Sequence, residues 1–131
     1  MPYRAVSTSS PIHEIKAALF KALGHPVRVR LLELLTPGEQ PVSELITATG
    51  LEASHLSQHL TVLRRTGLVT ARRTGNAVHY TLTHPSVVDL LTAARTFLVA
   101  SLSETRDALD DLEQELNQTT GETASTEEAA R

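Results

Sequence analysis

The chain has 131 residues with a formal net charge of -3, and 40% of them are hydrophobic, which is enough for one domain with a hydrophobic core. Aromatic residues make up only 3% of the sequence, which argues against a stacking platform for single-stranded nucleic acid and against a large aromatic ligand pocket. The sequence contains no cysteine, which excludes disulfides and thiolate metal sites.

The N-terminal residues predict a flexible arm. Residues 1–10 contain no apolar stretch like the core of a signal peptide, and no apolar run in the chain approaches the length of a membrane span. We therefore expect a soluble cytoplasmic protein with no membrane partner.

Two helices are predicted after the arm. A Ser-Ser-Pro run at 9–11 supplies a cap and a first-turn proline, and apolar residues then recur at helical spacing as far as Gly24. The second helix begins at Pro26 and continues through a leucine-rich stretch until Thr-Pro-Gly at 36–38 breaks it. Since aromatic residues are scarce, aliphatic packing between helices must form the core.

The next two helices have the spacing of a helix-turn-helix. Ser43 predicts the cap of a short third helix that ends at Gly50, and a fourth helix runs from about 52 to 66. The tight Gly50-Leu51 connection between them is typical of this motif. In helix-turn-helix proteins the second helix enters the major groove of double-stranded DNA.

The outer face of the fourth helix is polar, and no carboxylate occurs from residue 53 through residue 66. Leu56, Leu60 and Leu63 recur at helical spacing and turn inward, which leaves hydroxyl, amide and imidazole groups outside. Such groups can bond to base edges, and glutamine pairs bidentately with adenine. An ordinary solvated face normally mixes both charge signs, so the lack of acids favours DNA reading. The predicted base-reading residues are Ser54, His55, Ser57, Gln58, His59 and Thr61.

A basic hairpin is predicted directly after this helix. Residues 69–74 and 77–82 alternate like strands around Gly75-Asn76, a pair that tolerates the positive φ of a tight turn. Arginines at the helix end and in the hairpin can reach phosphates or the minor groove, although one of the two at the helix end could instead form an ion pair within the protein. The predicted backbone and wing contacts are Arg64, Arg65, Arg72, Arg73 and Asn76.

The last predicted helix is too long for this small domain to cover. Pro85 and Ser86 open it, and its leucines follow an alternating three- and four-residue spacing to about Asn117. That seam favours pairing with the same helix of a second copy, while packing on its own domain is the alternative. Residues 118–131 are small, polar and acidic, which predicts a disordered tail.

Three motifs make the chain resemble the ArsR/SmtB family of bacterial winged helix-turn-helix repressors. They are FKALGHPVRVRLLELL at 20–35, SHLSQHLTVLRRTGLV at 54–69 and RRTGNAVHYTL at 72–82. The resemblance implies a mainly α fold with a small β-hairpin in the order α-α-α-α-β-β-α over residues 11–117. The sequence contains no nucleophile elbow, no glycine-rich phosphate loop and no His-Glu-x-x-His pattern, which argues against an enzyme. The resemblance also implies a homodimeric transcription factor that binds an inverted repeat of double-stranded DNA. The implied dimer interface, through the first and last helices, is Ile12, Ile15, Leu19, Leu91, Leu98, Leu102 and Leu109.

Members of this family usually respond to a metal or metalloid ion, but the usual ligands are missing here. Pro41 and Ser43 occupy the two thiolate positions of the arsenic-type site, and only His84 matches a ligand of the zinc-type site on the last helix. The remaining candidate is a Ni²⁺ or Zn²⁺ site between protomers that uses His13, Glu14 and His84. The alternative is a metal-independent regulator that is switched by a second regulatory protein or by a small ligand at the dimer interface.

Overall fold

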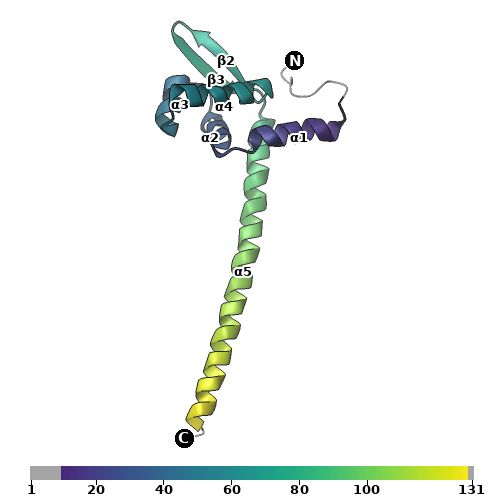
Figure 1. The fold of residues 1–131 in the computed structure, drawn as a ribbon, viewed down its shortest axis with the longest axis vertical. Helices are drawn as coiled ribbons and strands as arrows, with labels where there is room; N and C mark the ends of the chain where they lie inside the picture. Colours follow the sequence, from purple (N-terminus) through teal and green to yellow (C-terminus); the bar gives the residue numbers. More distant parts are fainter. Residues whose placement is uncertain (1–9, 130–131) are drawn as a thin grey trace. The chain divides into compact units, whose positions relative to one another are not determined.

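The computed structural model describes residues 10–129, with side chains through Gly121. It shows a mainly helical winged helix-turn-helix, as predicted (Figure 1). Two compact units are present, one that ends at Leu91 and one that begins at Thr92. The elements are α1 Ile12–Leu23, α2 Pro26–Leu35, β1 Gln40–Pro41, α3 Val42–Thr49, α4 Ala53–Arg65, β2 Val69–Thr74, β3 Ala77–Leu82 and α5 Ser86–Ala129.

The core of the first unit is aliphatic and centres on α2 and α4. Leucines from these helices lie at spacings of three and four residues, so each helix turns one apolar stripe inward. Because α4 buries this stripe, its position is fixed while its opposite face stays in solvent. The most deeply buried side chains are Leu31, Leu32, Leu35, Leu45, Leu56, Leu60, Leu63 and Val69.

The junction between α1 and α2 is held by two side chains of the sequence Gly24-His25-Pro26-Val27-Arg28. His25 is the N-cap of α2, and its Nδ1 accepts a hydrogen bond from the backbone N–H of Val27 at 3.1 Å. The guanidinium of Arg28 reaches back and donates to the carbonyls of Ala22 and Lys21 at the end of α1. Orphan backbone groups at both helix ends are therefore satisfied by this one segment.

The passage from α4 into β2 is a tight helix-ending motif. Gly67 has φ 76°, its N–H donates to the carbonyl of Arg64 at 3.1 Å, and the N–H of Leu68 donates to Leu63 at 2.9 Å. The side chain of Leu68 is buried against the core. This motif sets the angle at which the chain leaves α4, and so it determines where the hairpin begins.

The hairpin belongs to a three-stranded antiparallel sheet with the order β1-β3-β2. β2 and β3 have the predicted bounds, and the hydroxyl of Thr83 ties the end of β3 to the Gly67 carbonyl at 2.6 Å. The edge strand β1 was not predicted. It is too short to show alternation, and its Pro41 is tolerated because an edge strand can leave one side unpaired.

Two predicted helix caps were wrong. The N-cap of α1 is Pro11 and that of α3 is Pro41, and neither helix start has a side-chain cap hydrogen bond. Ser43 lies inside α3, because the extended backbone of Pro41 already starts the helix at Val42. Ser9 and most of the predicted arm at residues 1–10 lie outside the described residues.

The last helix, α5, runs past its predicted end near Asn117 and continues to Ala129. Polar composition alone does not end a helix, and no proline occurs in this part of the sequence. Residues 130–131 of the predicted tail lie outside the described range. By length and composition alone, the segment Ser86–Gly121 is long and apolar enough to cross a membrane.

Candidate nucleic-acid interface

The outward face of α4 offers neutral polar groups to a ligand. Ser54, Ser57 and Gln58 are exposed, on the part of the helix that the core leucines leave free. The hydroxyl of Thr61 donates to the Ser57 carbonyl at 2.8 Å, which leaves its oxygen able to accept. His55 is exposed as well. These donors and acceptors are the kinds that read base edges in the major groove.

The ring of His59 is turned toward the start of α2, unlike the exposed reading residues beside it. It is half-buried, and its centroid is 4.3 Å from that of His25, with the planes tilted by 46°. Burial lowers the pKa of His59, and the nearby His25, Arg28 and His55 lower it further. His59 is therefore neutral at physiological pH and links the reading helix to the start of α2.

Basic side chains stand at the end of α4. Arg64 and Arg65 are exposed, and neither forms an ion pair with any residue whose side chain the structure describes. The carbonyls of Val62 and Leu63 accept hydrogen bonds from the hydroxyl of Thr66, so the end of the helix is capped without the arginine side chains. Both arginines are thus free to meet backbone phosphates.

The tip of the wing is a two-residue turn. Gly75 has φ 60°, whereas Asn76 does not have a positive φ, a combination that matches a type II′ hairpin turn. Arg73 and Asn76 are exposed, and the side chain of Arg73 has no hydrogen bond or ion pair among residues 10–121. A free cation beside an exposed amide at the wing tip is suited to phosphate contact.

Arg72 is engaged within the protein, although the sequence predicted it as a second DNA contact on the wing. Its Nη2 lies 2.5 Å from Oε1 of Glu39 and its Nε lies 3.2 Å from Oε2. Glu39, which lies just before β1, therefore forms a bidentate ion pair with the hairpin residue Arg72. Glu39 was missed because nothing in the sequence signals that β1 pairs with β3.

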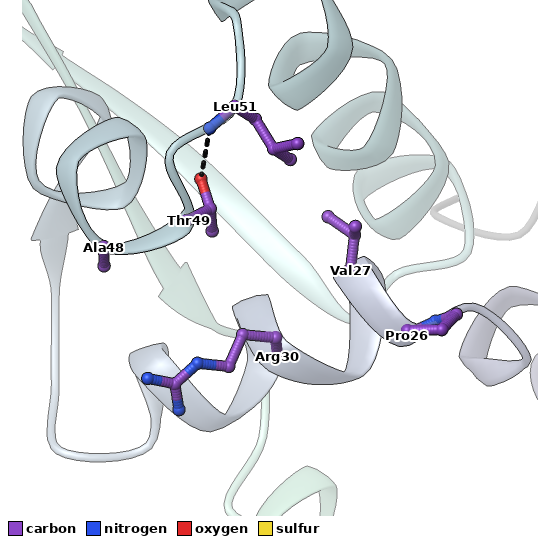
Figure 2. Close-up of a pocket in the computed structure, with 6 residues that line it drawn as sticks. All are labelled: Pro26, Val27, Arg30, Ala48, Thr49 and Leu51. Atoms are coloured by element: carbon purple, nitrogen blue, oxygen red, sulfur yellow. Dashed lines mark hydrogen bonds between the residues drawn. The ribbon is translucent and has the colours of Figure 1, made fainter.

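A shallow hollow of about 310 Å³ lies beside the helix-turn-helix turn (Figure 2). It is lined mostly by apolar groups of α2 and the end of α3, together with the exposed guanidinium of Arg30. The Leu51 N–H, in the turn itself, donates to the Thr49 hydroxyl at 3.4 Å. The lining residues are Pro26, Val27, Arg30, Ala48, Thr49 and Leu51.

The predicted metal ligands are exposed on separate elements. His13 and Glu14 lie on α1, and His84 lies between β3 and α5. Within the part of the chain whose side chains are described, no three His, Asp or Glu side chains gather as a metal-binding group. A site built from these residues would have to combine two protomers.

The predicted dimer residues differ in exposure. Leu19 and Leu91 pack partly against the core, and Ile15 is half-buried. The remaining members are exposed on their own helices: Ile12, Leu98, Leu102 and Leu109.

Comparison with known proteins agrees with this geometry. Residues 25–71, which span α2 to β2, match the model of the bacterial regulatory protein, arsR family. The HTH-type transcriptional regulator Rv0081 of Mycobacterium tuberculosis is 48% identical over 105 residues, which cover 79% of this chain and 92% of the relative. The chain belongs to the ArsR family. This family consists of transcriptional regulators, so the ArsR-family chain is a DNA-binding regulator and not an enzyme.

Solved structures extend the likeness to the fold. The crystal structure of Rv0081 aligns with a TM-score of 0.68 over 73% of this ArsR-family chain and 97% of the other. The repressor BigR from Xylella fastidiosa is 39% identical with a TM-score of 0.61, over 65% and 87% of the two chains. The homodimeric winged helix-turn-helix domain Mb0332 from Mycobacterium bovis is 30% identical with a TM-score of 0.62, over 71% and 90%.

Proposed function

We propose that this chain is a sequence-specific transcriptional repressor that binds an inverted repeat of double-stranded DNA as a homodimer. The reading helix is α4, the wing β2–β3 contacts the adjacent backbone, and the protein acts in the cytoplasm. The observation behind this proposal is the outer face of α4, where Ser54 and Gln58 are exposed and no carboxylate occurs from residue 53 to residue 86. A surface without acids lets a helix approach a polyanion without repulsion.

The exposed leucine seam of α5 supports dimerisation. Leu98, Leu102, Leu109, Leu112 and Leu116 follow four-, seven-, three- and four-residue steps, the spacing of a coiled-coil seam in which Thr105 fills the gap. A relative, the Mb0332 domain, is homodimeric. A second copy of the same helix would bury this seam, and two-fold symmetry would then match an inverted repeat in DNA.

A membrane is a less favourable environment for α5 than a protein partner. The most apolar part of α5, near the N-terminal end, includes Asp89 and Arg95, and acidic residues recur from Glu104 onward. Each charge at the centre of a membrane helix costs about 2.5–3.5 kcal/mol on insertion scales. We therefore assign the apolar face of α5 to a protein partner.

Base reading by α4 is tested with a matched pair of variants, Gln58→Ala and Arg65→Ala. Loss of Gln58 should remove discrimination between operator and scrambled DNA by about 1–3 kcal/mol. Loss of Arg65 should weaken binding to both DNAs and lower the salt slope by about one. Fluorescence anisotropy with both duplexes at several salt concentrations measures these effects, and an operator preference that survives Gln58→Ala would contradict the reading role.

The effector is a separate proposal with two candidates. One is Ni²⁺ or Zn²⁺ held between protomers by His13, Glu14 and His84, ligand types that suit these borderline ions. The other is a metal-independent switch by a second regulatory protein or by a small ligand at the dimer interface, which the scattered positions of these side chains favour. Calorimetric titration of nickel and zinc into wild type and His13→Ala separates the two: tight binding that the variant loses supports the metal site, and no binding supports the other switch.

A further inference from the structure

The guanidinium of Arg72 is held by two neighbouring side chains on one face of the wing, those of Glu39 and Thr74. Besides the two bonds to Glu39, its Nη1 donates to the hydroxyl of Thr74 at 2.7 Å. The carboxylate accepts a further hydrogen bond from the hydroxyl of Thr81 at 3.3 Å. One carboxylate outside the hairpin thus joins residues of both hairpin strands, β2 and β3.

Strand register places the two wing arginines on opposite faces of the hairpin. Arg72 pairs with His79, and Arg73 pairs with Val78. Side chains alternate along a strand, so Arg73 shares its face with Val69 and Tyr80, which point toward the core, while Arg72 lies on the other face. Adjacent arginines therefore meet different surroundings, which the sequence alone does not reveal.

Opposite charges strengthen the contact between Glu39 and Arg72. The hydrogen bond from Arg72 lowers the pKa of the Glu39 carboxyl, and the hydrogen bond to Glu39 raises the pKa of Arg72, so both groups are ionised at neutral pH. The side chains remain 35% and 59% exposed, respectively, so water and salt screen the pair and it adds little to global stability. We therefore expect the ion pair to act on the position and order of the hairpin and not on global stability.

We propose that Glu39 is a positioning residue for DNA binding: through Arg72 it fixes the wing against the segment that leads into β1. This inference rests on the proposed role of the wing in contacting DNA. A hairpin beyond the core is marginally ordered by itself, and ordering it before binding removes an entropy cost from association. In this proposal the Glu39–Arg72 pair is a brace, meaning an ion pair that orders the hairpin before DNA binds. Arg73 is the phosphate contact on the wing.

The test uses Glu39→Gln, Arg72→Gln and their double variant, with Arg73→Gln as the matched control from the neighbouring position. Each brace variant should weaken DNA binding about two- to fivefold, and the double variant should be no weaker than either single one. The dependence of binding on salt should keep the wild-type slope in all three. Arg73→Gln should instead lower that slope by about 0.9. Reversing the pair, with Glu39→Arg and Arg72→Glu together, should restore most of the binding.

Two outcomes would overturn the inference. If Glu39→Gln tightens binding while Arg72→Gln lowers the salt slope, the carboxylate withholds Arg72 from DNA. If the effects of the two substitutions simply add, the residues act independently.

Hydrogen exchange of the hairpin amides in free protein separates this inference from the proposed function. Glu39→Gln should speed exchange in β2 and β3, and unchanged exchange would refute the brace. If Arg73→Gln leaves the salt slope intact, the wing is not a phosphate contact and that part of the proposed function fails. In that case, hydrogen exchange of the β2 and β3 amides in the free protein would still test whether Glu39 orders the hairpin.

Discussion

Truncation of one seam leucine, Leu102→Ala, should weaken the dimer and leave the folded monomer unchanged. This side chain is 66% exposed on its own helix, so it adds little to the stability of the single chain. Full burial of a leucine is worth roughly 1.5–3 kcal/mol, and burying the exposed part is worth about 1–2 kcal/mol per protomer. A two-fold interface contains the residue twice, and alanine keeps part of the contact. The expected loss is about 1.5–3 kcal/mol per dimer, or roughly 10- to 150-fold in its dissociation constant.

Sedimentation velocity over a range of protein concentrations measures this constant. The matched control is Phe97→Ala, which also truncates an apolar side chain, exposed by 70%, but lies about 140° around the helix from Leu102. The control should associate like wild type, and thermal unfolding should show both variants folded. Equal weakening by the two substitutions, or no weakening by Leu102→Ala, would refute the assignment of this face to a second copy.

Three further predictions concern the folded unit. Leu60→Ala, which truncates a core leucine of α4, should lower the free energy of unfolding by about 2–5 kcal/mol in urea titration, and a loss below 1 kcal/mol would contradict the packing. Gly50→Ala places a side chain at φ 67°, where nothing within 4 Å would clash, so backbone strain alone should cost about 1–2 kcal/mol; unchanged thermal unfolding would rule out the left-handed turn. Because the pKa of folded His59 is lowered, its contribution to stability is complete above the unfolded value of about 6.5 and is lost as the pH falls through the folded pKa. Urea titrations from pH 7.5 to 5 should show this loss, and His59→Gln should reduce it; equal pH dependence in both proteins would exclude His59 as the cause.

Elements with strong local signals were predictable from the sequence. The Gly75-Asn76 turn and the alternation around it gave both strands of the hairpin their observed bounds. Gly50 and Gly67 ended α3 and α4 where positive φ is needed, and the leucine spacing gave the inward face of α4. Each of these features is set by residues within a few positions of one another.

Features set by tertiary pairing were not predictable. β1 is a strand only because β3 lies beside it, and that pairing brings Glu39 to Arg72 across 33 positions of sequence. The two arginines of the wing look alike in the sequence, yet strand register gives them different partners. The tilted ring contact between His59 and His25 likewise depends on how α4 packs over the start of α2. The cap at His25, by contrast, could have been found from its place just before a helix-starting proline.

Selection of bound duplexes from random DNA tests the central claim most directly. A dimer that reads DNA with two copies of α4 should enrich an inverted repeat whose half-site centres lie about 10–10.5 base pairs apart, or a multiple of that spacing. Gln58→Ala should blur the preference at the same position in both halves of the repeat. Enrichment of a single unrepeated site, or no enrichment over input DNA, would contradict a dimeric sequence-reading regulator.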